Sequence, residues 1–186
     1  MIIHNYVTFV ENTLNELGMS NIWISQFSCG VNPKWFKEKV KRTLKDIFLQ
    51  EWYSCVDNNN VYSNYRKFKW SFGPDAFYIT LPSDCAISLL RFRTTNNALP
   101  VNRLRSENVP IHERICQKCW LGDIGDEYHY LFLCPYFSEK RKEFLPKYYI
   151  DKPSFEKYHC LMSSNKKTLL LKLKHFVTYV CHNLRH

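Results

Sequence analysis

Apolar residues recur at helical spacing along much of this chain. Between residues 2 and 17 they stand three or four positions apart, and Gly18 follows where a glycine often ends a helix. A longer helix is predicted from Asn32, as its N-cap, through Pro33 at the first helical position to about Cys55. The apolar stripe of this helix consists of Phe36, Val40, Leu44, Ile47 and Phe48.

The rest of the chain shows the same helical preference with more interruptions. Residues 76–81 are expected to form a short extended piece, and residues 96–114 a loop-rich segment. Further helices are predicted over 85–94 and 135–145, after an N-cap at Ser154, and after an N-cap at Asn165. The fold class is therefore predicted to be mostly α.

The middle of the chain carries a motif that is typical of a closed zinc site. Cys116, Cys119, His129 and Cys134 follow the spacing C-x2-C-x9-H-x4-C. A Cys-x2-Cys turn directs two sulfurs at one ion, and a later His and Cys complete a Cys3His tetrahedron. The sequence Gly125-Asp126-Glu127 indicates the start of a helix that carries His129. The alternative is that four unrelated core residues happen to follow this spacing.

This motif suggests a division of the chain into three regions. We expect a helical region over 1–109, a small zinc-binding module over 110–140 inserted between helices, and a C-terminal helical extension over 141–186. Three thiolates on a divalent ion leave the centre negative, and Arg114 and Lys118 are expected to offset that charge.

The remaining cysteines favour a reducing compartment. They stand singly along the chain and are most simply small buried hydrophobic residues: Cys29, Cys55, Cys85, Cys160 and Cys181. No secretory signal is visible, and no apolar stretch approaches the ~18 residues of a membrane span. The protein is expected to be intracellular, either cytoplasmic or nuclear, with no membrane partner.

Positive charge indicates a polyanionic partner. The net charge is +9, and five arginines lie on the approach to the zinc motif. Arginine suits bidentate phosphate contacts, and nearby aromatic rings suit base stacking. The candidate nucleic-acid-binding residues are Arg91, Arg93, Arg103, Arg105, Arg114, Lys118 and Trp120. For Trp120 the alternative role is a lid over the zinc core.

The order of these motifs resembles a known family. The resemblance covers about residues 20–150 and rests on Trp23, Trp35-Phe36 and the segments 44–52, 65–69, 90–93, 99–101 and 114–134. This pattern resembles the C-terminal zinc-knuckle region of a non-LTR retrotransposon (LINE-type) reverse transcriptase. The resemblance implies a module that follows a polymerase core and engages template RNA or target DNA.

Motifs for catalysis are missing from the sequence. There is no Asp-Asp pair to hold polymerase metals, no Walker lysine loop and no Gly-x-Ser-x-Gly elbow. Pro74-Asp75 matches half of a nuclease motif, but no Glu-x-Lys follows it, and a Gly-Pro-Asp turn explains it fully. The chain is therefore expected not to be an enzyme and to take no small-molecule substrate.

Two functions remain open. The first is a non-sequence-specific RNA- or DNA-binding module, carried on a fragment without its own catalytic centre. The second is a zinc-stabilised protein-interaction module that docks on a reverse transcriptase core or another partner through its aromatic surface.

Overall fold

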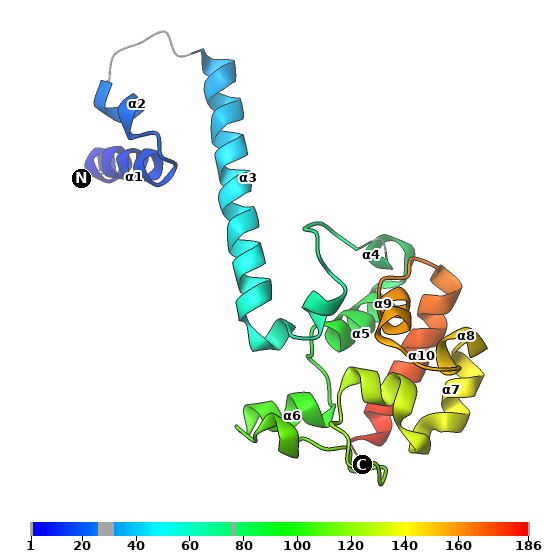
Figure 1. Ribbon diagram of the computed structural model, residues 1–186. Coiled ribbons are helices and arrows are strands. Elements are labelled where there is room, and N and C mark those ends of the chain that lie inside the picture. The colour runs from blue at the N-terminus through cyan, green and yellow to red at the C-terminus, as the bar shows by residue number, and fades with distance from the viewer. Residues whose placement is uncertain (1, 26–31, 76, 186) are drawn as a thin grey trace. The chain divides into compact units, whose positions relative to one another are not determined.

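The computed structural model describes residues 2–25, 32–75 and 77–185 (Figure 1). These residues belong to two compact units, Met1–Cys55 and Val56–His186. Both expected divisions, at residues 109 and 140, fall inside the second unit.

The first unit is helical. Helix α1 (Ile2–Glu16) ends at Gly18, whose φ of +67° is left-handed, as the sequence predicted. Helix α2 (Ser20–Ser25) packs against α1, and Leu17 and Met19 are buried in the turn between them.

Helix α3 (Pro33–Asn58) begins as predicted and continues slightly further than expected. The Asn32 Oδ1 accepts the backbone N–H of Lys34 at 2.8 Å, which confirms Asn32 as the N-cap. The predicted apolar stripe is only partly covered within this unit, because Leu44 and Phe48 are 51% and 52% exposed.

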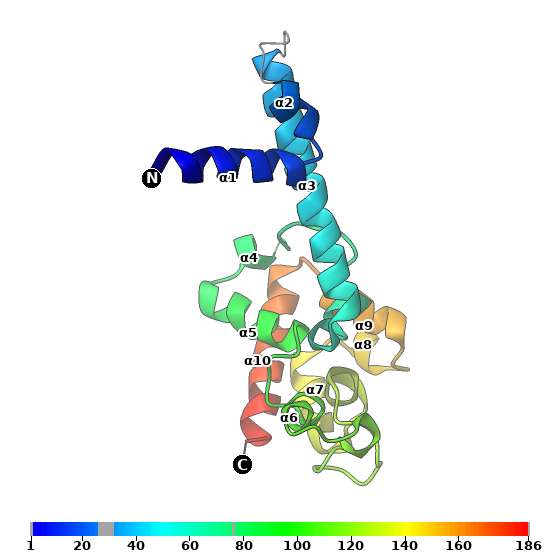
Figure 2. The same ribbon diagram turned by 90° about the vertical axis from the view of Figure 1, so that its left-hand side faces the viewer.

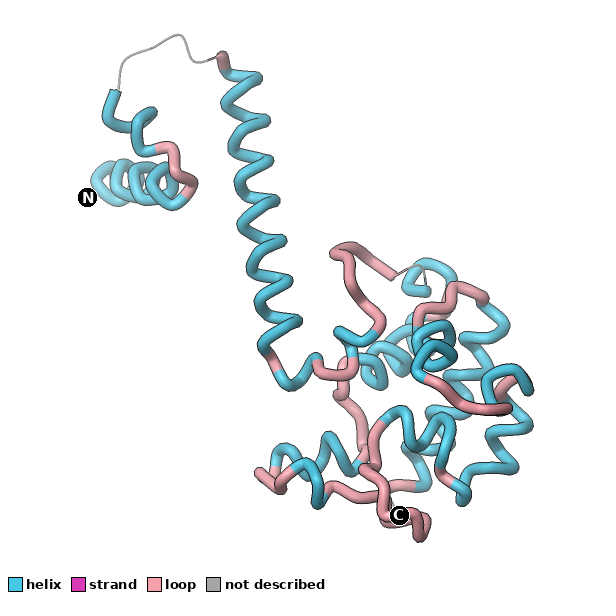
Figure 3. The backbone as a smooth tube through the Cα atoms, in the orientation of Figure 1, coloured by secondary structure: helices cyan, strands magenta, loops and turns pink. Residues whose placement is uncertain are grey.

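The second unit consists of short helices joined by loops (Figure 3). The only pairing of extended backbone among its described residues is an isolated antiparallel bridge between Ile115 and Ile124. The helices are η1 (Asn60–Tyr62), η2 (Tyr65–Lys67), α4 (Phe77–Thr80), α5 (Ser83–Arg93), α6 (Pro100–Ser106), η3 (Ile111–Glu113), η4 (His129–Leu133), η5 (Pro135–Phe137), α7 (Ser138–Phe144), α8 (Lys147–Ile150), α9 (Phe155–Met162) and α10 (Lys167–Asn183). The predicted mostly-α fold, with the Cys3His cluster between helices, is confirmed.

Two local predictions were wrong, and a third was incomplete. The expected extended piece at 76–81 contains helix α4, because its apolar side chains serve a helical core and Phe77 is fully buried. The segment 96–114 is not merely loop, since Pro100 starts helix α6 at its first position. The last helix is preceded by Lys166 at its N-cap position and not by Asn165.

Helix α10 forms the centre of the second unit. It packs against α5 and α7 (Figures 1 and 2). Its apolar face is buried, through Leu170, Leu173, Phe176, Val177 and Val180. None of the described helices is both long and apolar enough to cross a membrane.

Cysteines of the zinc motif share this core. Cys116 and Cys134 belong to the same buried cluster as Phe92 of α5 and Leu173 of α10. The metal module is therefore part of the second unit's hydrophobic core.

An ion pair joins distant parts of the second unit. Asp75 accepts from Lys69 at 2.7 Å and from Arg93 at 3.3 Å. The Arg93 guanidinium lies over the Phe77 ring at 4.2 Å and also donates to the Met162 carbonyl. Asp75 therefore forms salt bridges with two cationic side chains in a largely buried cluster.

Candidate metal centre

A short hairpin positions the first two cysteines. The Cys116 N–H donates to the Asp123 carbonyl at 2.8 Å, and the Gly125 N–H donates to the Arg114 carbonyl at 2.9 Å. Gly122 adopts a φ of +72° where the chain turns back, a conformation that favours glycine. The hairpin thereby holds Cys116 and Cys119 at its closed end.

A capped helical turn positions His129 and Cys134. The Asp126 Oδ1 accepts the His129 backbone N–H at 2.8 Å, which confirms a helix start at this point. The turn then widens to a π-helix over His129–Leu133, and the Cys134 N–H donates to the His129 carbonyl at 2.8 Å. This wider turn brings Cys134 back toward the histidine that precedes it by five residues.

The four side chains meet with metal-site geometry. Their ligand atoms all lie within 4.8 Å of one another. The Cys116 and Cys134 sulfurs are 3.9 Å apart, and the Cys119 sulfur is 3.5 Å from the His129 Nε2. A tetrahedral ion with Zn–S of ~2.3 Å and Zn–N of ~2.05 Å requires about 3.8 and 3.6 Å for these pairs. The cluster can therefore hold a metal ion.

The histidine is prepared for ligation through Nε2. Its other nitrogen, Nδ1, is buried 3.4 Å from Asp123 Oδ2 and makes no hydrogen bond with the described residues. A carboxylate behind a ligating histidine orients the ring and selects the tautomer. Burial lowers the pKa of His129, which favours the neutral imidazole that binds metal.

The thiols need a cation to ionise. Burial raises the pKa of Cys134 to about 12, and it also raises the pKa of Cys119. A bound divalent ion reverses this preference, because metal coordination stabilises the thiolate directly. The donor set of three sulfurs and one nitrogen is the chemistry that Zn²⁺ selects.

Arg141 is the buried charge beside the cluster, a position that the sequence interpretation gave to other residues. Its side chain is 4% exposed and donates to the carbonyls of Cys134 at 2.8 Å and Tyr130 at 3.2 Å. No described carboxylate forms a salt bridge with it, and burial lowers its pKa to about 10. A divalent ion with three thiolates has a net charge of −1, which this guanidinium complements.

Arg114 and Lys118, the predicted charge partners of the cluster, make other contacts. Arg114 donates to the carbonyls of Val109 at 2.7 Å and Val101 at 3.1 Å, and so ties down the loop that leads into the hairpin. Lys118 is half-buried with its ammonium 5.9 Å from the Tyr136 ring.

The acidic residue at the helix start has a structural task. Glu127 is buried, and its Oε1 accepts from the side-chain amides of Asn102 at 2.8 Å and Asn97 at 3.1 Å. This network joins the loop before α6 to the turn that carries His129. From the sequence, Glu127 was expected only to be part of a helix start.

The predicted nucleic-acid-binding residues divide into two groups. Arg93 is 2% exposed and pairs with Asp75, so it is not available for a phosphate. Arg105 donates hydrogen bonds to the Thr95 hydroxyl at 3.2 Å and to the Asn60 carbonyl at 3.3 Å. Arg114 donates to two backbone carbonyls, as described above. Arg91, Arg103 and Trp120 are exposed, and Lys118 is half-buried and forms no salt bridge with a described residue.

Trp120 is not a lid. Its side chain is 83% exposed, on the hairpin surface directly after Cys119. The alternative reading of this residue was therefore wrong, since a lid over the metal would be covered by the core that it closes.

The cysteines outside the cluster are not uniformly buried. Cys85 is buried and Cys181 is half-buried, but Cys55 and Cys160 are exposed because their helices turn them to solvent. Cys29 lies outside the described residues.

Comparisons with protein-family models, with curated proteins and with solved structures give no match.

Proposed function

We propose that this chain is a zinc-stabilised module that binds RNA or DNA without sequence specificity. Zinc is the ion that best suits the site, because three thiols and one imidazole Nε2 converge with tetrahedral spacing in a largely buried setting. All four protein donors are present, which is typical of a structural centre and leaves no open position for a reacting water.

The observation that carries the nucleic-acid role is a set of basic side chains with little counter-charge on the metal hairpin, on α6 and on α5. Among the described residues, Arg91 and Lys118 form no salt bridge, and the Arg103 pair with Glu107 is an exposed contact at 3.8 Å. Exposed pairs of this kind contribute little, so Arg103 remains able to contact a phosphate. Trp120 adds an exposed ring for stacking on a base.

The resemblance to the C-terminal region of a LINE-type reverse transcriptase is consistent with this role. In our proposal the chain acts beside a polymerase core and has no catalytic centre of its own. Asp75, the carboxylate of the half-matched nuclease motif, is paired with Lys69 and Arg93, which supports that view.

The test is the salt dependence of binding to a labelled oligonucleotide, followed by fluorescence anisotropy. Each phosphate contact lowers the slope of log K against log salt by about 0.7 for a single strand and 0.9 for a duplex. We expect a slope that corresponds to several contacts. A chain with full metal content and no measurable affinity at low salt would overturn the nucleic-acid role.

A second candidate rests on a different observation. The hairpin exposes Trp120 at 83% and Leu121 at 45%, and Tyr136 of η5, whose ring lies 5.9 Å from the Lys118 ammonium of the hairpin, is 55% exposed. Exposed apolar groups near one another often mark a protein-binding surface. If oligonucleotides do not bind, a protein partner docked on this surface is the better account, and Trp120→Ala would abolish its capture.

A further inference from the structure

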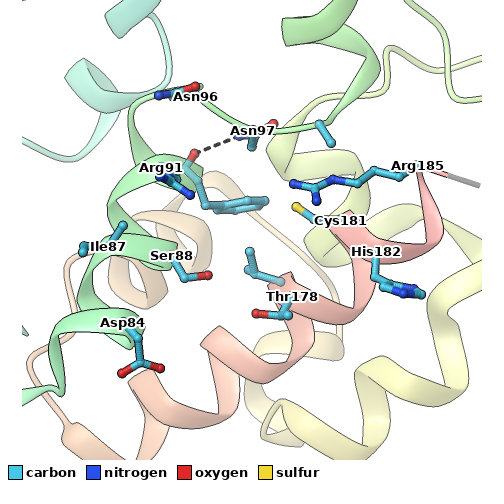
Figure 4. Close-up of a pocket in the computed structure, with 13 residues that line it drawn as sticks. Asp84, Ile87, Ser88, Arg91, Asn96, Asn97, Thr178, Cys181, His182 and Arg185 are labelled. Atoms are coloured by element: carbon cyan, nitrogen blue, oxygen red, sulfur yellow. Dashed lines mark hydrogen bonds between the residues drawn. The ribbon is translucent and has the colours of Figure 1, made fainter.

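Two neighbouring cavities, together called the groove, are lined by residues of α5, of the C-terminal end of α10 and of the metal hairpin. One cavity of about 250 Å³ lies between α5 and α10, and Arg91, Phe92 and Arg185 are among its lining residues (Figure 4). A neighbouring cavity of about 480 Å³ is lined by Arg103, Gln117 and Lys118. Arg185 and Ala98 line both cavities, so the two are immediate neighbours.

The walls of this groove are strongly positive. Arg91 projects from α5 and Arg185 from the end of α10, and Figure 4 shows both side chains directed into the same space. Neither arginine forms a salt bridge with a described residue. The lining contains one carboxylate, Asp84, which lies 3.9 Å from the Lys174 ammonium. Like charges that converge without counter-ions indicate an anionic occupant.

Apolar residues also line the groove. Phe92 and Val177, which are buried, line the first cavity, and Leu184 and Pro100 line the second. A nucleotide whose phosphate binds the cationic side chains would therefore place its base against apolar side chains, as in single-strand-binding sites. The two cavities lie near the lower end of the ~300–1,000 Å³ typical of small-ligand clefts, which is far too small for a duplex.

The groove is joined to the metal centre by hydrogen bonds. Asn97 lines the first cavity, donates to the Phe92 carbonyl at 3.3 Å, and donates to Glu127 at 3.1 Å. Glu127 begins the turn that carries His129. Lys118 stands between two metal ligands in the sequence and lines the second cavity. The shape of the groove therefore depends on the folded metal module.

We propose that this groove is the binding path for a single-stranded RNA or DNA segment, with Arg91 and Arg185 as a phosphate clamp. The inference rests on the proposed nucleic-acid-binding function and assigns it a place, a strand state and a residue, Arg185, that the sequence interpretation did not select. The base of the nucleotide whose phosphate is clamped occupies the cavity between α5 and α10.

The experiment compares three full-length proteins at equal zinc content. Arg91→Gln and Arg185→Gln are combined in one variant. Lys172→Gln and Lys147→Gln, two exposed lysines away from the groove, are combined in a second variant with the same net charge. Each protein is titrated against a fluorescein-labelled oligo(dT), an oligo(rU) and a blunt DNA duplex, over a series of salt concentrations.

We expect the groove variant to bind single strands more weakly than wild type and with a smaller slope of log K against log salt. Loss of two phosphate contacts lowers its slope by about 1.4 relative to wild type, while the control variant keeps the wild-type slope. The wild-type chain binds single strands more tightly than the duplex.

Other outcomes separate the two proposals. In one outcome, wild type binds with a steep salt slope while both variants lose the same small amount of affinity. That result would contradict the groove as the binding path and leave the general nucleic-acid-binding function standing. Tighter binding to the duplex also overturns the groove. If wild type binds no oligonucleotide, the proposed function fails and the groove inference fails with it. Both arginines are exposed and free of salt bridges, so the groove variant is expected to fold.

Discussion

Arg141 provides a quantitative test of the metal centre. We consider Arg141→Met, which keeps the length of the side chain and removes its charge. The wild-type guanidinium makes two buried hydrogen bonds, to the carbonyls of Cys134 and Tyr130, at 2.8 and 3.2 Å. Each such charged bond contributes about 1.5–3 kcal/mol, and both are lost whether or not metal is bound.

The charge effect depends on the metal. With metal bound, the guanidinium complements a centre of net charge −1, and without metal it is a buried cation that lacks a described carboxylate partner. Its removal should therefore weaken metal binding beyond any general loss of stability. Loss of a supporting residue behind metal ligands typically costs ~10–100-fold in metal affinity, or about 1.4–2.7 kcal/mol.

The assay is competition for zinc against a chelating dye of known affinity, with refolded protein at constant pH. We expect Arg141→Met to bind zinc ~10–100-fold more weakly and Arg141→Lys, which keeps the charge, to lie between it and wild type. Lys142→Met is the control, because the adjacent side chain is 62% exposed and pairs with Glu139. An unchanged zinc affinity in Arg141→Met would refute the assignment of Arg141 as the counter-charge.

Four further outcomes follow from the structure. Arg93→Leu should lower the free energy of unfolding by about 3–5 kcal/mol in urea titration, because it breaks a buried ion pair, whereas Arg91→Leu on the same helix should change it by less than ~0.5 kcal/mol. Trp120→Ala should likewise change the free energy of unfolding by less than ~0.5 kcal/mol, since its ring is 83% exposed. A loss of ~3–5 kcal/mol in the same titration would instead indicate that Trp120 covers the metal cluster. Metal chelation should increase hydrogen exchange over residues 110–140 and in contacting parts of α5 and α10, with α3 unaffected, because Cys116 and Cys134 belong to the shared core. With Mg²⁺ the chain should leave supercoiled plasmid uncut; nicking that Asp75→Ala abolishes at unchanged folding would contradict the reading of Asp75 as a structural anchor.

The sequence was sufficient to predict the helical class and the four side chains that form the Cys3His cluster. Helix spacing and caps are local properties, so Asn32 and Ser154 could be identified as N-caps before any tertiary contact was known. The Cys-x2-Cys and His-x4-Cys arms are also local, because each lies within one turn of backbone. Their meeting required only that the hairpin and the helical turn fold toward each other.

What the sequence could not show depends on burial and long-range contacts. Arg91 and Arg93 are two residues apart on one helix, yet one faces solvent and the other pairs with Asp75, eighteen positions away. Arg141 and Arg185 are ordinary basic residues in sequence, and only the packing of α7 and α10 places one behind the metal cluster and the other in the groove. The segment 76–81 was misread because so short an apolar run has no clear period.

The central claim is a structural zinc centre formed by Cys116, Cys119, His129 and Cys134. Native mass spectrometry of the purified chain tests it most directly, with Cys134→Ser as the ligand variant and Cys160→Ser, at an exposed cysteine, as the matched control. The account predicts one zinc ion per chain in wild type and in the control, and loss of that ion in the ligand variant. A folded wild-type chain whose native mass contains no metal would contradict it.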